Sequence, residues 1–148
     1  GASALGVDDV GYYEAISVAE HLVERGLKVT SVTRHSAFAP SIEYAVRTEP
    51  ALRRLRQGDF ELVTRGRLVE VRPGQAVIGL LEGEQVRTVP ADTVVLVAHN
   101  RPVTEVYEAL GGRDAGGPVQ LRIIGDAHSP RDLLMAIREG HLVARSLA

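Results

Sequence analysis

The chain has 148 residues, 45% of them hydrophobic, which is enough to bury the core of one ordinary domain or two small ones. Its 17 basic and 19 acidic residues give a net charge of -2 and are scattered, so we expect neither a nucleic acid nor a membrane as partner. The absence of cysteine excludes disulfides and cysteine-held zinc or iron-sulfur clusters in this segment, and the lack of a long apolar run or signal-peptide pattern predicts a soluble, cytoplasmic protein.

The first 33 residues predict a strand, a helix and a second strand. Leu5 to Asp8 is a short apolar segment, and Tyr12 to Arg25 carries apolar residues at helical spacing, followed by Gly26 as a C-terminal cap. Leu27 to Thr33 is rich in β-branched residues and alternates apolar with polar side chains. This order favours a parallel pair of strands joined by a helical crossover.

The middle of the chain changes its pattern. His35 to Thr48 predicts a loop, after which Pro50 stands at the expected first position of a short helix over Ala51 to Gln57. From Phe60 to Val89, strand-length pieces separated by glycines or a proline-glycine pair predict an antiparallel β meander inserted in the α/β pattern.

The α/β pattern then resumes. The apolar run from Asp92 to Ala98 predicts a parallel strand buried on both faces, and Thr104 to Leu110 predicts a short helix ending at Gly111-Gly112. Arg113 to Pro118 is expected to form a flexible connection.

One more strand is expected over Val119 to Ile124, and a closing helix over Pro130 to Leu147. The fold class is therefore α/β: a three-layer, Rossmann-like FAD/NAD(P)-binding fold, with a parallel sheet partly covered by an antiparallel β meander.

The turn after the first strand, VDDVGYYEA, departs from the glycine-rich turn of dinucleotide sites. Gly11 is its only glycine, Asp8 and Asp9 place negative charge where a pyrophosphate would lie, and Tyr12 and Tyr13 fill space that glycines leave open. A structural role, in which Asp9 or its neighbour caps the helix, is the more common explanation of such acids.

Two further features bear on ligand binding. Arg34, just after the second strand, lies where a ribose phosphate could be bound, although a solvated arginine at a strand end is commoner. The five histidines are dispersed and suggest neither a metal site nor a nucleophile-base pair.

Gly125-Asp126 ends the last predicted strand just before the closing helix. A carboxylate there can accept hydrogen bonds from a ribose or ribityl hydroxyl while helix amides face a phosphate. The same dipeptide also suits a simple helix-entry turn, and the residues alone leave both interpretations open.

Three stretches taken together resemble a known family. VDDVGYYEAISVAEHLVERGLKVTSVTR, PADTVVLVAHNRPVTEVYEAL and IIGDAHSPRDLLMAIREGHLVARSLA look, in order and spacing, like the C-terminal part of flavoenzymes related to trimethylamine dehydrogenase and 2,4-dienoyl-CoA reductase. The resemblance runs over nearly the whole chain and is weakest through the meander.

The resemblance implies a longer protein that begins with an old yellow enzyme-type FMN barrel and an iron-sulfur site and acts on amines or enoyl thioesters. Residues 1–112 would then be the inserted NAD(P)-binding-like domain, and residues 113–148 the last strand and helix of an FAD-binding-like domain. Gly125 and Asp126 would contact FAD or ADP, with Ala127, Pro130 and Arg131 at the following turn and helix start.

The departures in the first turn disfavour NAD(P)H and place the chain on the trimethylamine dehydrogenase side of the family, where electrons leave through an electron-transferring flavoprotein. Gly11, Tyr12 and Arg34 remain the candidate contacts if a nucleotide does bind there. The alternatives are a structural or partner-docking domain that has lost nucleotide binding, and a working NAD(P)H domain with an unusual turn.

The segment alone is expected to be catalytically inert. Without the rest of its parent flavoenzyme, the closing strand and helix should expose apolar surface, so we expect a homo-oligomer.

Overall fold

The computed structural model describes residues 1–112 and 120–147. The chain forms two compact units, Gly1–Ala98 and His99–Ala148, which are described separately below. The two units divide after Ala98. The boundary expected after Gly112 separates an NAD(P)-binding-like domain from the end of an FAD-binding-like domain, and it stays a prediction. The flexible connection expected over residues 113–118 lies outside the described residues.

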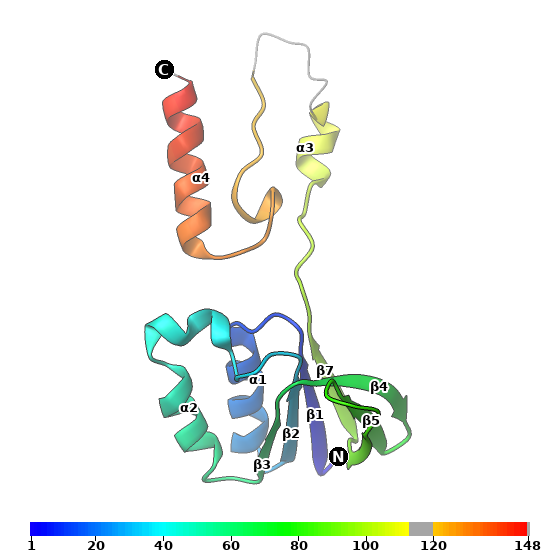
Figure 1. Ribbon diagram of the computed structural model, residues 1–148. Coiled ribbons are helices and arrows are strands. Elements are labelled where there is room, and N and C mark those ends of the chain that lie inside the picture. Colours follow the sequence, from blue (N-terminus) through cyan, green and yellow to red (C-terminus); the bar gives the residue numbers. More distant parts are fainter. Residues whose placement is uncertain (113–119, 148) are drawn as a thin grey trace. The chain divides into compact units, whose positions relative to one another are not determined.

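The first unit is built on a parallel four-stranded sheet (Figure 1). Its order is β3-β2-β1-β7, with β1 at Ser3–Asp8, β2 at Lys28–Thr33, β3 at Phe60–Val63 and β7 at Thr93–Val97. All three neighbouring pairs are parallel, and β1 runs in register with β2 from Ser3 to Asp8. The predicted strand-helix-strand unit is confirmed.

Helix α1, Tyr13–Glu24, connects β1 to β2 and ends at the predicted glycine. Gly26 has a φ of 76°, and its N–H donates to the Val23 carbonyl at 2.9 Å. The N–H of Leu27 reaches back to the Leu22 carbonyl at 3.2 Å, which completes a Schellman motif. The helix buries the face formed by Ala15, Ile16 and Ala19.

The segment between β2 and β3 is more helical than expected. A short 3₁₀ helix, η1, covers Pro40–Ala45 within the predicted loop, and α2 covers Thr48–Leu55. Pro50 is therefore the third helical residue and not the first, so that prediction was wrong by two positions. The helix tolerates it because a residue in the first turn has no intrahelical acceptor for its N–H.

The antiparallel meander consists of β4 (Gly66–Arg72), β5 (Gln75–Leu80) and β6 (Val86–Pro90). The predicted antiparallel meander is confirmed, but the expectation that β3 belongs to this meander was wrong. β3 pairs with β2 in parallel, because the α2 crossover returns the chain to the same end of the sheet.

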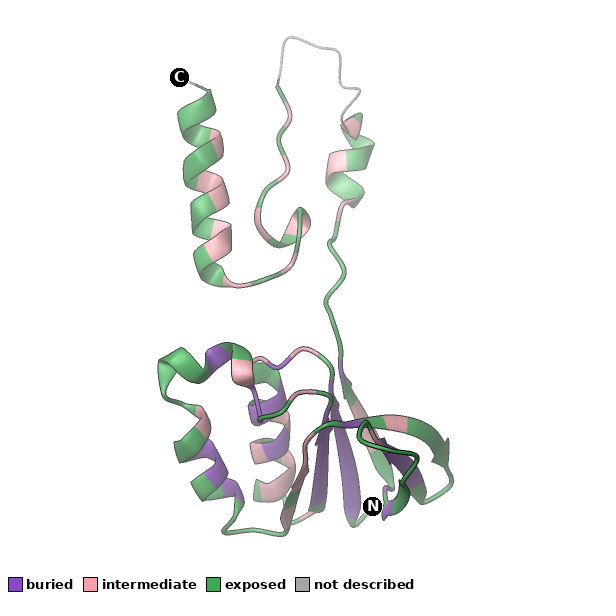
Figure 2. Ribbon diagram, in the orientation of Figure 1, coloured by how far each residue is buried: buried purple, intermediate pink, exposed green. Residues whose placement is uncertain are grey.

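The sheet lies between two apolar clusters, so the first unit has the three predicted layers (Figure 2). On one face, α1, α2 and the segment after β2 form a cluster of Ala15, Ile16, Ala19, Phe38, Ala39, Ile42, Ala51, Leu52, Leu55 and Val97. On the other face, the meander packs on β1 and β2 through Leu5, Val7, Val32, Ala76, Ile78, Val89 and Ala91.

β7 corrects the expectation of a strand buried on both faces. Val97 is buried, but Leu96 is 64% exposed. Among the described strands β7 pairs with β1 alone, so it forms an edge of the sheet. An apolar run cannot distinguish an edge strand from a central one, because that depends on which partners are present.

The second unit contains α3 (Glu105–Ala109), the 3₁₀ helix η3 (Gly125–Ala127) and α4 (Leu133–Ser146). The short helix before Gly111 is confirmed. The closing helix begins at Leu133 and not at Pro130, because the side chain of Asp132 caps it by accepting the Met135 N–H at 2.7 Å.

The strand predicted over Val119 to Ile124 is not formed in its described part, residues 120–124, which join no ladder with another described segment. Ile124 nevertheless has an extended backbone. A strand needs a partner, and none of the described segments supplies one.

α4 presents apolar side chains to solvent within the second unit. Leu133 and Leu134 are 76% and 72% exposed, and no residue of 99–112 or 120–147 is fully buried. The apolar surface expected on this segment is therefore present, and self-association stays a prediction.

Asp92 ties the start of β1 to the loop before β7 and should make the first unit sensitive to acid. Its Oδ2 accepts the Ala2 N–H at 2.7 Å, then the hydroxyl and N–H of Ser3, each at 3.0 Å, and these bonds hold the pKa of Asp92 below its ordinary value. A depressed folded-state pKa stabilises the fold above the unfolded pKa of about 4, and this contribution is lost as pH falls through the folded value.

We therefore expect Asp92→Asn to lower the melting temperature at pH 6, with the difference from the unmodified chain shrinking as the pH falls below about 4. Calorimetric melting between pH 6 and pH 3 measures it. Asp59→Asn, at an exposed carboxyl without a hydrogen bond among the described residues, is the matched control. A difference that stays constant with pH would contradict the assignment.

Candidate functional site

The turn between β1 and α1 is occupied by the carboxylate of Asp8. Oδ1 accepts the N–H of Val10 at 3.1 Å and that of Gly11 at 2.8 Å, while Oδ2 accepts the Thr33 hydroxyl at 3.2 Å. Asp8 is only 3% exposed. In a dinucleotide site, turn amides of this kind face the pyrophosphate. Here two of them are already bonded to a side chain of the protein.

Gly11 shapes the same turn. Its φ of 71° lies in the left-handed region, and its carbonyl accepts the Ser41 N–H at 3.0 Å. A Cβ at this position would lie 3.0 Å from His35 Nε2 and 3.1 Å from Pro40 Cδ. The glycine is therefore required by the packing of the turn against the segment after β2, and not by space left for a ligand.

The remaining predicted residues of this end of the sheet do not converge on one site. Tyr12 has an extended backbone at the N-cap of α1, makes no capping bond with its side chain and packs against the helix-side cluster. Tyr13 is exposed beneath the guanidinium of Arg47, 6.0 Å from its ring centroid. Arg34 is exposed and has no hydrogen bond or ion pair to another described residue. The helix cap expected from Asp9 or its neighbour is not formed: the N-cap of α1 has no side-chain hydrogen bond, and the Asp8 carboxylate accepts the amides of Val10 and Gly11, which precede the helix.

In the second unit, Glu139 organises the turn at Gly125. Its Oε2 accepts the Gly125 N–H at 2.8 Å, and its Oε1 is paired with the Arg131 guanidinium. His128 Nδ1 lies 3.5 Å from the same carboxylate. Two residues predicted to contact FAD or ADP, Gly125 and Arg131, are thus both engaged by a side chain of α4 that is 17% exposed.

Asp126 faces a hollow of about 290 Å³ in this unit. The predicted residues Ala127 and Pro130 line it together with Asn100, Arg101 and Val103. The structure therefore brings Asp126, Ala127 and Pro130 together and adds a guanidinium that the sequence reasoning did not include. The signal was available, since Asn100 and Arg101 follow closely after an apolar strand.

The described residues contain no group of three or more histidine or acidic side chains placed to hold a metal ion. Within the same ranges, none of the helices combines the length and the apolar character that spanning a membrane requires.

Neither the known family models nor the curated proteins include a match to this chain. Solved structures do match. Histamine dehydrogenase from Rhizobium sp. 4-9 superimposes with a TM-score of 0.87 at 24% identity, over 99% of this chain and 23% of that one. The 6-hydroxypseudooxynicotine amine oxidase HisD from Pseudomonas geniculata N1 gives a TM-score of 0.86 at 26% identity, over 95% and 21%.

A 2-naphthoyl-CoA reductase follows, with a TM-score of 0.75 at 22% identity over 95% of this chain and 20% of that one. The chain thus spans between a fifth and a quarter of the length of these three proteins. All three are flavoenzymes of the trimethylamine dehydrogenase and old yellow enzyme family. The resemblance seen in the sequence is confirmed: the chain matches a C-terminal part of flavoenzyme oxidoreductases of this family.

Proposed function

We propose that the chain is a nucleotide-domain-like part of an amine dehydrogenase-type flavoenzyme, with the FMN and iron-sulfur chemistry outside these residues. The Rossmann-like architecture supports it, as do two amine-oxidising enzymes among the similar structures. In this proposal the chemical step lies outside these residues, so their contribution is structural or ligand-binding.

The observation that carries the rest of the proposal is the carboxylate of Asp8 inside the first turn. A pyrophosphate entering this turn would meet a buried negative charge and amides that already donate to it. Displacing Asp8 would also leave the Thr33 hydroxyl without its acceptor. We infer that the first unit does not take up NADH or NADPH, and that its fold serves as a scaffold.

The hollow at Asp126 is the candidate place for a nucleotide within the described residues of the second unit. Asp126 can accept hydrogen bonds from ribose or ribityl hydroxyls, and Arg101 on the same hollow supplies a positive charge for phosphate. Glu139 competes with any phosphate for Arg131 and for the Gly125 amide. The residues therefore fit FAD or ADP, with binding centred on Asp126 and Arg101.

A second candidate function is a non-catalytic structural domain, or a docking domain for an electron-transferring partner. The internal carboxylates of Asp8 and Glu139 favour it, because both turns are complete without a ligand.

Calorimetric titration of the chain with NADH, NADPH, ADP and FAD tests these alternatives. We expect no heat of binding from the nicotinamide nucleotides, and ADP or FAD binding that Arg101→Ala removes. Arg145→Ala, a matched loss of charge on α4 outside the hollow, should leave it unchanged. Micromolar NADH or NADPH binding would overturn the scaffold role, whereas no detectable binding of any of the four ligands would favour the structural or docking domain.

A further inference from the structure

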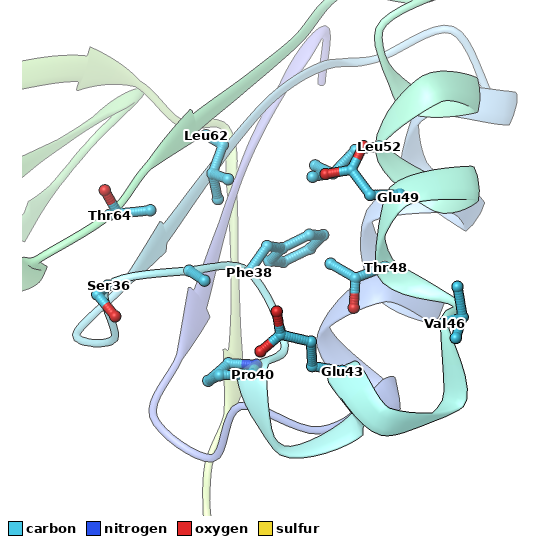
Figure 3. Close-up of a pocket in the computed structure, with 11 residues that line it drawn as sticks. Ser36, Phe38, Pro40, Glu43, Val46, Thr48, Glu49, Leu52, Leu62 and Thr64 are labelled. Atoms are coloured by element: carbon cyan, nitrogen blue, oxygen red, sulfur yellow. The ribbon is translucent and has the colours of Figure 1, made fainter.

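A second concave region lies in the first unit, at the carboxyl ends of β2 and β3. Its volume is about 400 Å³, within the range of small-molecule sites. The apolar part of its lining comes from the segment after β2, from α2 and from β3, namely Ala37, Phe38, Pro40, Val46, Leu52 and Leu62. Figure 3 shows Phe38, Pro40, Val46, Leu52 and Leu62 among the side chains that line this space.

The charged groups of this cavity are both acidic. Glu43 belongs to η1 and Glu49 to the first turn of α2, and no arginine, lysine or histidine lines the cavity. Neither carboxylate forms an ion pair with another residue in the described part of the chain. The basic residue between them in sequence, Arg47, lies over the ring of Tyr13 instead. The cavity therefore combines apolar walls with two solvent-exposed carboxylates that form no ion pair within the described residues.

Two further features lie at the border of this cavity. The hydroxyl of Thr48, another lining residue, is buried and has no partner among the described residues. Val46 at the rim has a φ of 54°, a left-handed conformation that β-branched residues rarely adopt. A strained backbone and an unpaired hydroxyl thus border the same space as the two carboxylates.

We propose that this cavity binds an organic ammonium ion, a protonated amine carried on a hydrocarbon or aromatic body. The apolar walls would contact the body, and Glu43 and Glu49 would hold the ammonium group. An anionic ligand would be repelled. A small inorganic cation would gain nothing from the apolar walls, and two carboxylates are fewer than the oxygen ligands it needs. The assignment is independent of the proposed function, since none of these residues belongs to either nucleotide turn.

The test uses 2-phenylethylammonium as the probe, titrated into the ¹⁵N-labelled chain and followed by amide chemical shifts. Saturable shifts are expected in residues 36–52 and around residues 62–64. The neutral 2-phenylethanol and the anionic 3-phenylpropionate have similar apolar bodies and should bind at least about 5- to 10-fold more weakly, as expected for the loss of two partly exposed charge pairs.

Glu43→Gln and Glu49→Gln should each weaken binding of the ammonium probe about 3- to 5-fold, and the double variant more strongly. Glu84→Gln, in the exposed connection between β5 and β6, carries the same change of charge and should have no effect. Equal binding of the three probes, unchanged affinity in both cavity variants, or shifts confined to other residues would overturn the proposal. Nucleotide titrations of the two turns do not bear on this result, so the two proposals fail separately.

Discussion

Replacing Asp8 with alanine is expected to destabilise the first unit by about 3 kcal/mol. The substitution removes the acceptor of the Val10 and Gly11 amides and of the Thr33 hydroxyl. The two turn amides and the Thr33 hydroxyl at the end of β2 are partly or wholly buried, and a buried donor left without a partner is more costly than the bond itself contributes. Urea unfolding followed by circular dichroism measures the loss.

Two variants separate this cause from a general effect of charge. Asp9→Ala removes a neighbouring exposed carboxylate and should change stability by less than about 0.5 kcal/mol. Asp8→Asn keeps one oxygen for the two amides and should lie between the other two variants. Equal destabilisation by Asp8→Ala and Asp9→Ala would mean that the turn does not depend on these hydrogen bonds.

Gly11→Ala is expected to destabilise the first unit by about 2 to 4 kcal/mol. Roughly 1 to 2 kcal/mol comes from placing a Cβ in the left-handed conformation, and about 1 to 2 more from overpacking. The added methyl would meet His35 Nε2 at 3.0 Å and Pro40 Cδ at 3.1 Å. Because both neighbours are ring atoms in a packed segment, they have little freedom to move away.

Gly26→Ala is the matched control, since Gly26 has a φ of 76° but no atom within 4 Å of the place where an added methyl would lie. Gly26→Ala should lower the free energy of unfolding only by the cost of the left-handed backbone, about 1 to 2 kcal/mol. The difference between the two unfolding free energies therefore measures the close approach of the turn to His35 and Pro40. No difference would show that the turn can move away from these two residues at little cost.

The features that sequence alone predicted are those with local causes. α1 has its apolar residues on one face, and Gly26 follows it where a left-handed cap is needed, so both could be predicted from neighbouring residues. The turns of the meander and the glycines after α3 are local signals of the same kind. The three-layer α/β class followed from the order of these elements.

The errors concern strands whose environment depends on distant partners. β3 joins the parallel sheet, Leu96 of β7 is exposed, and residues 120–124 stay unpaired among the described segments. A β-rich stretch specifies its own extended backbone but not the direction or presence of its neighbour. The start of α4 was misplaced for a different reason: Pro130 suited a first helical position, but the Asp132 side chain caps the helix further on.

For the candidate sites, the sequence indicated which residues carry negative charge but not which hydrogen bonds their carboxylates form. Asp8 was expected to repel a pyrophosphate, yet only the fold shows that its carboxylate accepts the turn's own amides. Glu139 could not be connected to Gly125, 14 positions earlier, before the path of η3 and α4 was known. Arg101 could likewise be assigned to the hollow at Asp126 only from the fold, because the two residues are far apart in the sequence.

Both expected nucleotide turns share one arrangement: a glycine amide donates to a carboxylate of the same chain, at 2.8 Å in each case. A domain whose turn amides are completed by a bound cofactor gains stability as cofactor concentration rises, by mass action. A domain completed from within has no such dependence. We therefore expect the first unit to reach its native state regardless of cellular nucleotide supply, so that its folding and lifetime do not vary with the concentration of any nucleotide.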